Sequence, residues 1–182
     1  PGTRIDGAGA GIHIALRVPQ VTVQLAISYI SAEQAWENLR QDSYVGGIAA
    51  AAEAAEREWE EHLSRIAVES DDEEQLRTFY SCLYRCFLFP HIAYEQAADG
   101  TLVHYVPSTG GVAPGRRYAD IGFWDVYRTL FPLFSLIARD EYAQMLEGFL
   151  TDYRECGWLP RWPSIGEVGC MPSTLIDAVI AD

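Results

Sequence analysis

The stretch from Asp120 to Asp182 constrains the fold most, because helical patterns alternate there with loops that no helix can continue through. Residues 120–132 read DIGFWDVYRTLFP, residues 157–163 read GWLPRWP and residues 166–172 read GEVGCMP. Gly and Pro interrupt helices, so residues 157–163 and 166–172 read as loops. Flat rings beside carboxylates also suit sugars, whose C–H faces pack on rings and whose hydroxyls donate to carboxylates. The stretch therefore predicts helices joined by rigid loops that carry a sugar-binding surface.

Three helices are predicted within this stretch. Residues 124–138 have helical periodicity, and Pro132 should kink that helix or lie near its start. Asp140 is a candidate N-cap for a second helix over residues 141–155, which Gly157 should end. The last helix begins near residues 173–174.

The first 30 residues favour β structure. Residues 12–18 alternate between apolar and polar, and residues 21–30 are rich in β-branched side chains. Two strands do not make a stable sheet by themselves. We therefore expect residues 1–30 to be the last strands of a β domain whose earlier strands lie outside this sequence.

Residues 31–90 favour helices. Ser31 and Gln34 have capping-box spacing before a helix over residues 32–41, and an Ala- and Glu-rich helix is predicted over residues 48–66. Asp71 or Asp72 can cap a third helix that ends before Pro90. The third helix has a wide apolar face and is expected to be nearly buried. Residues 31–70 thus read as a helical linker, and residues 71–182 as the start of a helical domain.

Residues 93–119 are irregular, with one predicted strand over residues 101–106 in a hairpin around Asp99 and Gly100. His91 is interpreted as a hydrogen-bonded structural residue, with a base or ligand as the alternative. The order of helices and long aromatic loops suits a barrel or toroid of paired helices, whose loops build a cleft at one end.

The composition excludes several function classes. Thirteen basic and 26 acidic residues give a net charge of −13, which opposes binding to nucleic acid or anionic membranes. The four cysteines include no CxxC pair and are expected to be buried free thiols. Free thiols and the lack of a signal peptide favour the cytoplasm, while a secreted or periplasmic location stays open because the sequence begins without Met.

Several motifs together resemble glycoside hydrolase family 92, the calcium-dependent inverting exo-α-mannosidases. The resemblance lies in FYSCLYR at residues 79–85, GFWDVYRTLFPL at residues 122–133 and GWLPRW at residues 157–162, with GEVGCM at residues 166–171 following. It extends to residues 27–39, where the family leaves its N-terminal β-sandwich. The resemblance implies that the chain is a fragment holding the last sandwich strands, the linker and the first part of an (α/α)6 barrel.

The resemblance also implies which residues bind substrate. Trp124 and Asp125 would line the pocket for a terminal mannose, and the other expected substrate-binding residues are Arg128, Trp162 and Glu167. The family's general acid and base motifs do not occur in this sequence, and most ligands of its Ca²⁺ are expected outside it. The loop at residues 166–169 departs from the family's commoner Asn-Asn-Glu-Thr form, which leaves the linkage or leaving group open.

Inverting hydrolysis needs two carboxyl groups roughly 6.5–9.5 Å apart. From the sequence alone, Asp125 and Glu167 could be such a pair, and Glu167 is the candidate catalytic residue considered. The alternatives are an ion pair of Asp125 with Arg128 and a solvated loop carboxylate at Glu167. With the resemblance, both carboxylates are interpreted as binding groups, Arg128 as a residue that orients Asp125, and the isolated chain as inactive.

Two other functions remain compatible with these residues. A carbohydrate-binding module without catalysis could use the same aromatic side chains. A structural helical domain could hold partner chains with its loops. The mannosidase interpretation predicts a mannose-containing glycan as the partner.

Overall fold

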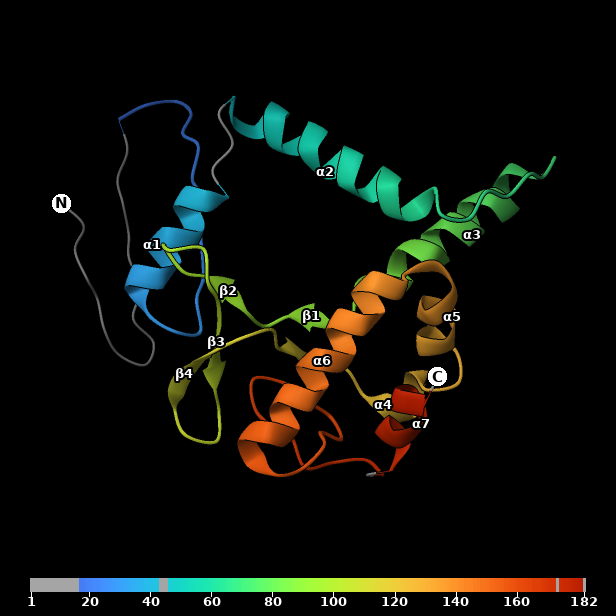
Figure 1. Cartoon of the computed structure of the whole chain (residues 1–182). Helices are drawn as coiled ribbons and strands as arrows, with labels where there is room; N and C mark the ends of the chain where they lie inside the picture. Colours follow the sequence, from blue (N-terminus) through green and yellow to red (C-terminus); the bar gives the residue numbers. More distant parts are fainter. Residues whose placement is uncertain (1–16, 43–45, 173, 182) are drawn as a thin grey trace.

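The computed structural model describes residues 17–42, 46–172 and 174–181 and is mainly helical, with two small antiparallel sheets (Figure 1). Most of the strand predicted at residues 12–18 lies outside these residues. The mainly helical content is confirmed, while the (α/α)6 barrel and the β-sandwich stay predictions. No helix in the described part is long and apolar enough to cross a membrane.

Residues 21–30 form no strand, in contrast to the sequence prediction. Five apolar side chains at alternate positions are exposed there: Val21, Val23, Leu25, Ile27 and Tyr29. A strand requires a neighbouring strand to pair with its backbone N–H and C=O groups, and none of the described strands pairs with this segment. The alternating pattern is therefore present without the pairing that would make it a strand.

The three predicted helices of the first half form close to their predicted bounds. They are α1 (Ala32–Gln41), α2 (Gly47–Leu63) and α3 (Glu73–Cys86). Ser31 caps α1 by accepting a hydrogen bond from the Gln34 backbone, and Asp72 caps α3 by accepting from two backbone N–H groups. Of the two candidates for the N-cap of this helix, Asp71 and Asp72, the structure therefore has Asp72.

The expected burial of α3 is wrong, since Leu83 is its only buried residue. Figure 1 shows why: α2 and α3 extend along one edge of the molecule, and α3 meets α5 and α6 at its C-terminal end, where the ring centroids of Phe87 and Phe134 lie 5.4 Å apart. The apolar face of α3 contacts α2, where Trp59 and Tyr84 have ring centroids 4.4 Å apart. Periodicity identified the apolar face but not how much of it is covered.

The irregular segment contains two small sheets. β1 (His91–Ile92) pairs with β5 (Tyr118–Ala119), and β2 (Glu95–Gln96), β3 (Leu102–Val106) and β4 (Gly111–Pro114) form an antiparallel sheet in that order. The predicted strand and its hairpin around Asp99 and Gly100 are confirmed. The β1–β5 pair brings His91 beside the segment that leads to the Trp-Asp motif, which consists of Trp124 and Asp125.

The predicted helix over residues 124–138 is broken into α4 (Phe123–Val126) and α5 (Leu130–Ile137). Pro132 lies in the first turn of α5, where its missing N–H would have no helical partner. α6 (Arg139–Cys156) begins without the side-chain cap that was predicted for Asp140, and it ends at Gly157 with φ +80° as expected. α7 (Leu175–Ala181) completes the described chain.

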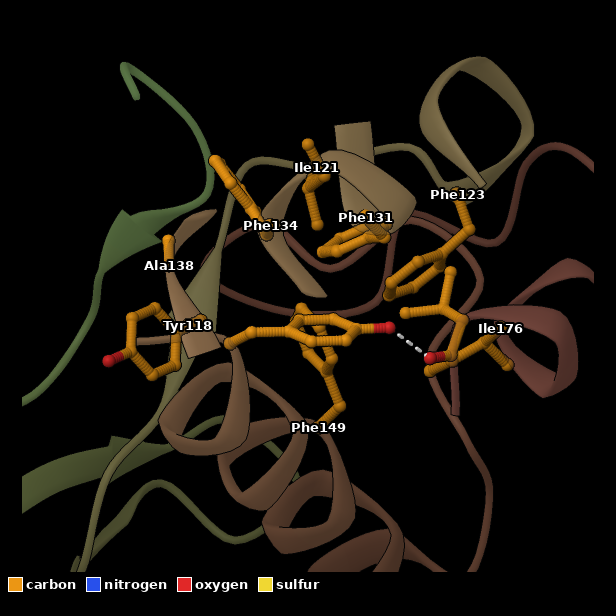
Figure 2. Close-up of a cluster of buried hydrophobic side chains, with 10 residues drawn as sticks. Tyr118, Ile121, Phe123, Phe131, Phe134, Ala138, Phe149 and Ile176 are labelled. Atoms are coloured by element: carbon orange, nitrogen blue, oxygen red, sulfur yellow. Dashed lines mark hydrogen bonds between the residues drawn. The ribbon is translucent and has the colours of Figure 1, made fainter. Parts of the chain in front are cut away.

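One aromatic core holds this second half together (Figure 2). Phe131 is fully buried, and its ring lies 5.8–6.3 Å, centroid to centroid, from the rings of Phe123, Phe134, Tyr142 and Phe149. The Tyr142 hydroxyl donates to the Val179 carbonyl and so joins α6 to α7. The core thereby fixes α4, the helix that carries the Trp-Asp motif.

All four cysteines are free, as expected, but three of them are exposed rather than buried. Cys86 is partly buried. Burial, together with the neighbouring Cys82, raises the pKa of its thiol.

Candidate functional site

The predicted site residues Asp125 and Trp162 meet over Gly122. A Cβ atom built on Gly122 would lie 2.3 Å from Trp162 Nε1 and 2.9 Å from Asp125 Oδ2. Both distances are too short for a real Cβ, so only glycine lets the indole and the carboxylate approach here. The structure therefore joins a ring and an acceptor, which lie far apart in the sequence, in one place.

The Asp125 carboxylate is open to a ligand. Asp125 is exposed on α4, and no side chain in the described part of the chain donates a hydrogen bond to it. Its neighbour Trp124 is 55% exposed. An exposed carboxylate beside the Trp162 indole can accept hydroxyl protons while the ring covers C–H groups.

Arg128 does not orient Asp125, in contrast to the prediction. No ion pair joins the two among the described residues, and the Arg128 guanidinium lies 5.0 Å from the centroid of the Tyr127 ring. The break between α4 and α5 after Val126 explains the difference. Residues three apart face each other on a continuous helix, and this helix ends between them.

Asp120 ties the Trp-Asp segment to the loop that carries Trp162. Its backbone N–H donates to the Pro163 carbonyl at 2.6 Å, and its two carboxylate oxygens accept from Ser164 Oγ and face His91 Nδ1, both at 2.9 Å. Asp120 has φ +61°, a left-handed conformation that Asp tolerates better than most residues. His91 is thus a hydrogen-bonded residue, as interpreted from the sequence.

Glu167 is held within its own loop. Its carboxylate accepts hydrogen bonds from the backbone N–H groups of Arg161, Trp162 and Gly169 at 3.0–3.3 Å. The Arg161 side chain lies 3.6 Å from it. The observed contacts of Glu167 hold the backbone that positions Trp162.

These contacts show which site residues sequence reasoning missed. The site is held together by Gly122, Asp120 and Ser164. No sequence pattern marks any of the three as a site residue. The close approach to Gly122 depends on residues 40 positions away, so it is visible only in three dimensions.

The described residues do not fit a metal centre. No group of three or more His, Cys, Asp or Glu side chains among residues 17–42, 46–172 and 174–181 could hold a metal ion. Ca²⁺ prefers six to eight oxygen ligands, which Asp125 and Glu167 do not supply.

Comparisons with known proteins identify the family of the chain. The family description "Glycosyl hydrolase family 92 catalytic domain" matches residues 34–182. Among solved structures, the chain is similar to the family 92 inverting mannosidase of Bacteroides thetaiotaomicron VPI-5482, with a TM-score of 0.80 and 37% sequence identity. That similarity covers 84% of this chain and 21% of the mannosidase chain.

No curated protein matches the chain. The family match nevertheless includes every predicted site residue, from Trp124 to Glu167, and the structural match extends the likeness to the fold. The chain therefore belongs to glycosyl hydrolase family 92.

Proposed function

We propose that this chain is part of an inverting α-mannosidase and forms one wall of the pocket that binds a terminal α-linked mannose. The observation that carries the proposal is the meeting of the Asp125 carboxylate and the Trp162 indole over Gly122. Family membership supports a glycoside hydrolase and does not favour a purely binding or structural module.

Each predicted residue has a definite role in this proposal. Asp125 accepts hydrogen bonds from sugar hydroxyls, and Trp124 and Trp162 cover the apolar face of the ring. Arg128 is exposed close to the motif and lines the outer part of the pocket. Glu167 contributes to substrate binding by fixing the loop of Trp162, not as the acid or base.

The remaining parts of the reaction lie outside these residues in this proposal. The helices from α3 onward belong to an (α/α)6 barrel, α1 and α2 belong to the helical linker, and the segment before α1 belongs to the end of a β-sandwich. The acid that protonates the leaving group, the base that activates water and the Ca²⁺ ligands lie in further parts of a longer protein. A bound Ca²⁺ would supply Lewis-acid stabilisation of charge on the sugar oxygens.

The test compares hydrolysis by the 182-residue chain and by the full-length protein that carries it. We expect the longer protein to hydrolyse an aryl α-mannoside and linkage-defined mannobiosides, to release the β-anomer first, and to lose activity with a chelator. The 182-residue chain should give no turnover.

Two results would contradict the proposal. Turnover by the 182-residue chain would place the acid and the base among its own residues. Inactivity of the full-length protein on every α-mannoside linkage, with Ca²⁺ present, would reject the mannosidase assignment.

A further inference from the structure

A hollow of about 350 Å³ lies between β1 and the segment that leads into α1. Residues 27–29 form one wall, and residues 91–95 form the other. None of the predicted substrate-binding residues lines this hollow, and neither does Gly122. It is therefore a different surface from the one proposed to hold the terminal mannose.

Hydrogen bonds hold the two walls of the hollow together. Glu95 Oε1 accepts from the Tyr29 backbone N–H at 3.0 Å, and Glu95 Oε2 accepts from Asn38 Nδ2 at 2.7 Å. Asn38 Nδ2 also donates to the Ile27 carbonyl at 3.0 Å. Figure 1 shows the same arrangement, with α1 beside β2. The hollow thus has a defined shape although residues 21–30 form no strand.

His91 brings an unused hydrogen-bonding nitrogen to this hollow. Its Nδ1 lies 2.9 Å from Asp120 Oδ2. A carboxylate only accepts hydrogen bonds, so Nδ1 carries the proton and donates it. In a neutral imidazole the other nitrogen, Nε2, is then an acceptor, and it has no partner in the described part of the chain. The His91 side chain is 55% exposed, so a ligand can reach Nε2.

The rest of the lining suits a sugar ring. Tyr29 and Ile92 line the hollow and are 47% and 62% exposed, so they present apolar faces to a ligand. Hydroxyls of a sugar donate to acceptors such as His91 Nε2, while its C–H groups pack on the Tyr29 ring. The carboxylates of Glu95 and Asp120 oppose an anionic ligand, because like charges repel. A neutral, hydroxyl-rich ligand therefore fits these groups best.

Asp120 joins this hollow to the proposed mannose pocket. One of its carboxylate oxygens faces His91, and the other accepts from Ser164 Oγ in the loop of Trp162. Asp120 also lies two residues from Gly122, so the Cα atoms of these two residues are at most about 7 Å apart. A glycan whose terminal mannose lies over Gly122 can therefore bring a following sugar unit to His91.

We propose that this hollow binds a further sugar unit of the substrate, with a hydroxyl donated to His91 Nε2 and C–H groups against the Tyr29 ring. The inference rests on the proposed function, in which a terminal mannose is removed. Every other sugar of the glycan is then on the leaving-group side of the bond that is cleaved. His91 is accordingly a specificity-determining residue for the leaving group, and it acts neither as the acid nor as the base.

The first test compares kcat/KM of the full-length protein on an α-mannotriose and on an aryl α-mannoside, which has no second sugar. His91→Asn is the deciding variant, because its amide N–H can still donate to Asp120 while nothing replaces Nε2. We expect kcat/KM to fall about tenfold on the mannotriose, the effect of one hydrogen bond. It should stay at the wild-type value on the aryl mannoside.

Tyr29→Ala is the second variant, since it removes the exposed ring of the hollow and leaves His91 in place. It should show the same selective loss on the mannotriose. Trp36→Ala removes an exposed ring of α1 that does not line the hollow, and this matched control should keep wild-type kcat/KM on both substrates.

Two kinetic results would overturn the proposal. Wild-type kcat/KM of His91→Asn on the mannotriose would leave His91 as a structural partner of Asp120 alone. Equal losses on both substrates would place its effect in the mannose pocket and not at a second sugar.

A binding measurement separates this proposal from the mannosidase proposal. The imidazole C–H signals of the 182-residue chain are followed by nuclear magnetic resonance during titration with mannobiose, and His91 is assigned by the loss of its signal in His91→Asn. We expect a saturable shift of the His91 signal with mannobiose and none with glycerol, which has hydroxyls but no ring. No saturable shift with mannobiose of any linkage would overturn the second sugar site. Failure of the mannosidase proposal would instead appear as absent hydrolysis by the full-length protein while the His91 signal still shifts.

Discussion

The two halves of the chain differ in how far they bury their apolar side chains. Ten side chains between Tyr118 and Val179 form one buried core, whereas α1 and α2 have no buried residue. Trp36 and Ile48 in the first half are 66% and 75% exposed, and Phe131 and Phe149 in the second half are 0% exposed. Both halves nevertheless have the apolar spacing of helices.

The candidate site therefore lies in the half of the chain that has a buried core of its own. α4, with its Trp-Asp motif, is anchored to the core through Phe123, and the loop of Trp162 is anchored through Asp120. The first half contributes helices whose apolar faces are open. Stability and site geometry should therefore respond to changes in the second half far more than in the first.

The largest effect is expected for Phe131→Ala, which removes the ring at the centre of the core. The free energy of unfolding should fall by about 3–5 kcal/mol, as is typical for a fully buried aromatic side chain. Trp36→Ala in the exposed part of α1 should change it by about 0.5 kcal/mol or less. Denaturant unfolding followed by circular dichroism measures both, and equal losses would remove the contrast between the halves.

Gly122→Val should have the next largest effect. The new side chain collides with Trp162 and approaches Asp125, so the indole must move. We expect a loss of about 1–3 kcal/mol in the free energy of unfolding. We also expect the nuclear magnetic resonance signal of the Trp162 indole N–H to stop shifting when methyl α-mannoside is added. Gly166→Ala is the matched control, because its Cβ would make an ordinary 3.5 Å contact with Pro107. A wild-type shift of the Trp162 signal in Gly122→Val would show that Trp162 does not belong to the sugar site.

Glu167→Gln tests the loop rather than the core. The amide keeps one acceptor oxygen but loses the charge that three backbone N–H groups share. We expect a loss of about 1 kcal/mol and faster proteolysis between residues 161 and 169. Glu58→Gln on the exposed face of α2 should leave that rate unchanged. Unchanged proteolysis in Glu167→Gln would show that Glu167 does not hold the loop.

The smallest effect is expected for Glu141→Gln, and it should depend on pH. Burial raises the Glu141 pKa, but the hydrogen bond from Arg65 and its charge outweigh burial, so the net shift is downward from 4.5. A lowered folded-state pKa stabilises the fold above pH 4.5, and that stabilisation is lost as pH falls through the lowered value. The difference between wild type and variant should therefore shrink on acidification. A difference that grows at low pH would contradict the sign.

The sequence predicted those parts of the structure that depend on nearby residues. The helices over residues 32–41 and 48–66, the cap at Ser31 and the stop at Gly157 follow from local preferences and are confirmed. The family resemblance, carried by contiguous motifs, is confirmed as well.

The parts that failed depend on tertiary partners. Three features depend on tertiary contacts that the sequence does not show. They are the exposed apolar face of α3, the absence of a strand over residues 21–30, and the contact of Arg128 with Tyr127 in place of Asp125. The meeting of Asp125 and Trp162 needed both the core and the Asp120 hydrogen bonds. Sequence reasoning identified these two side chains but not the glycine that lets them meet.

The most direct test of the account is the kcat/KM of the full-length protein on an aryl α-mannoside with Asp125→Asn. We expect a fall of about a hundredfold, because a charged acceptor for sugar hydroxyls is lost at the reacting ring. The exposed Asp140→Asn is the matched control and should retain wild-type activity. Wild-type kcat/KM in Asp125→Asn would contradict the claim that this carboxylate lies in the mannose pocket.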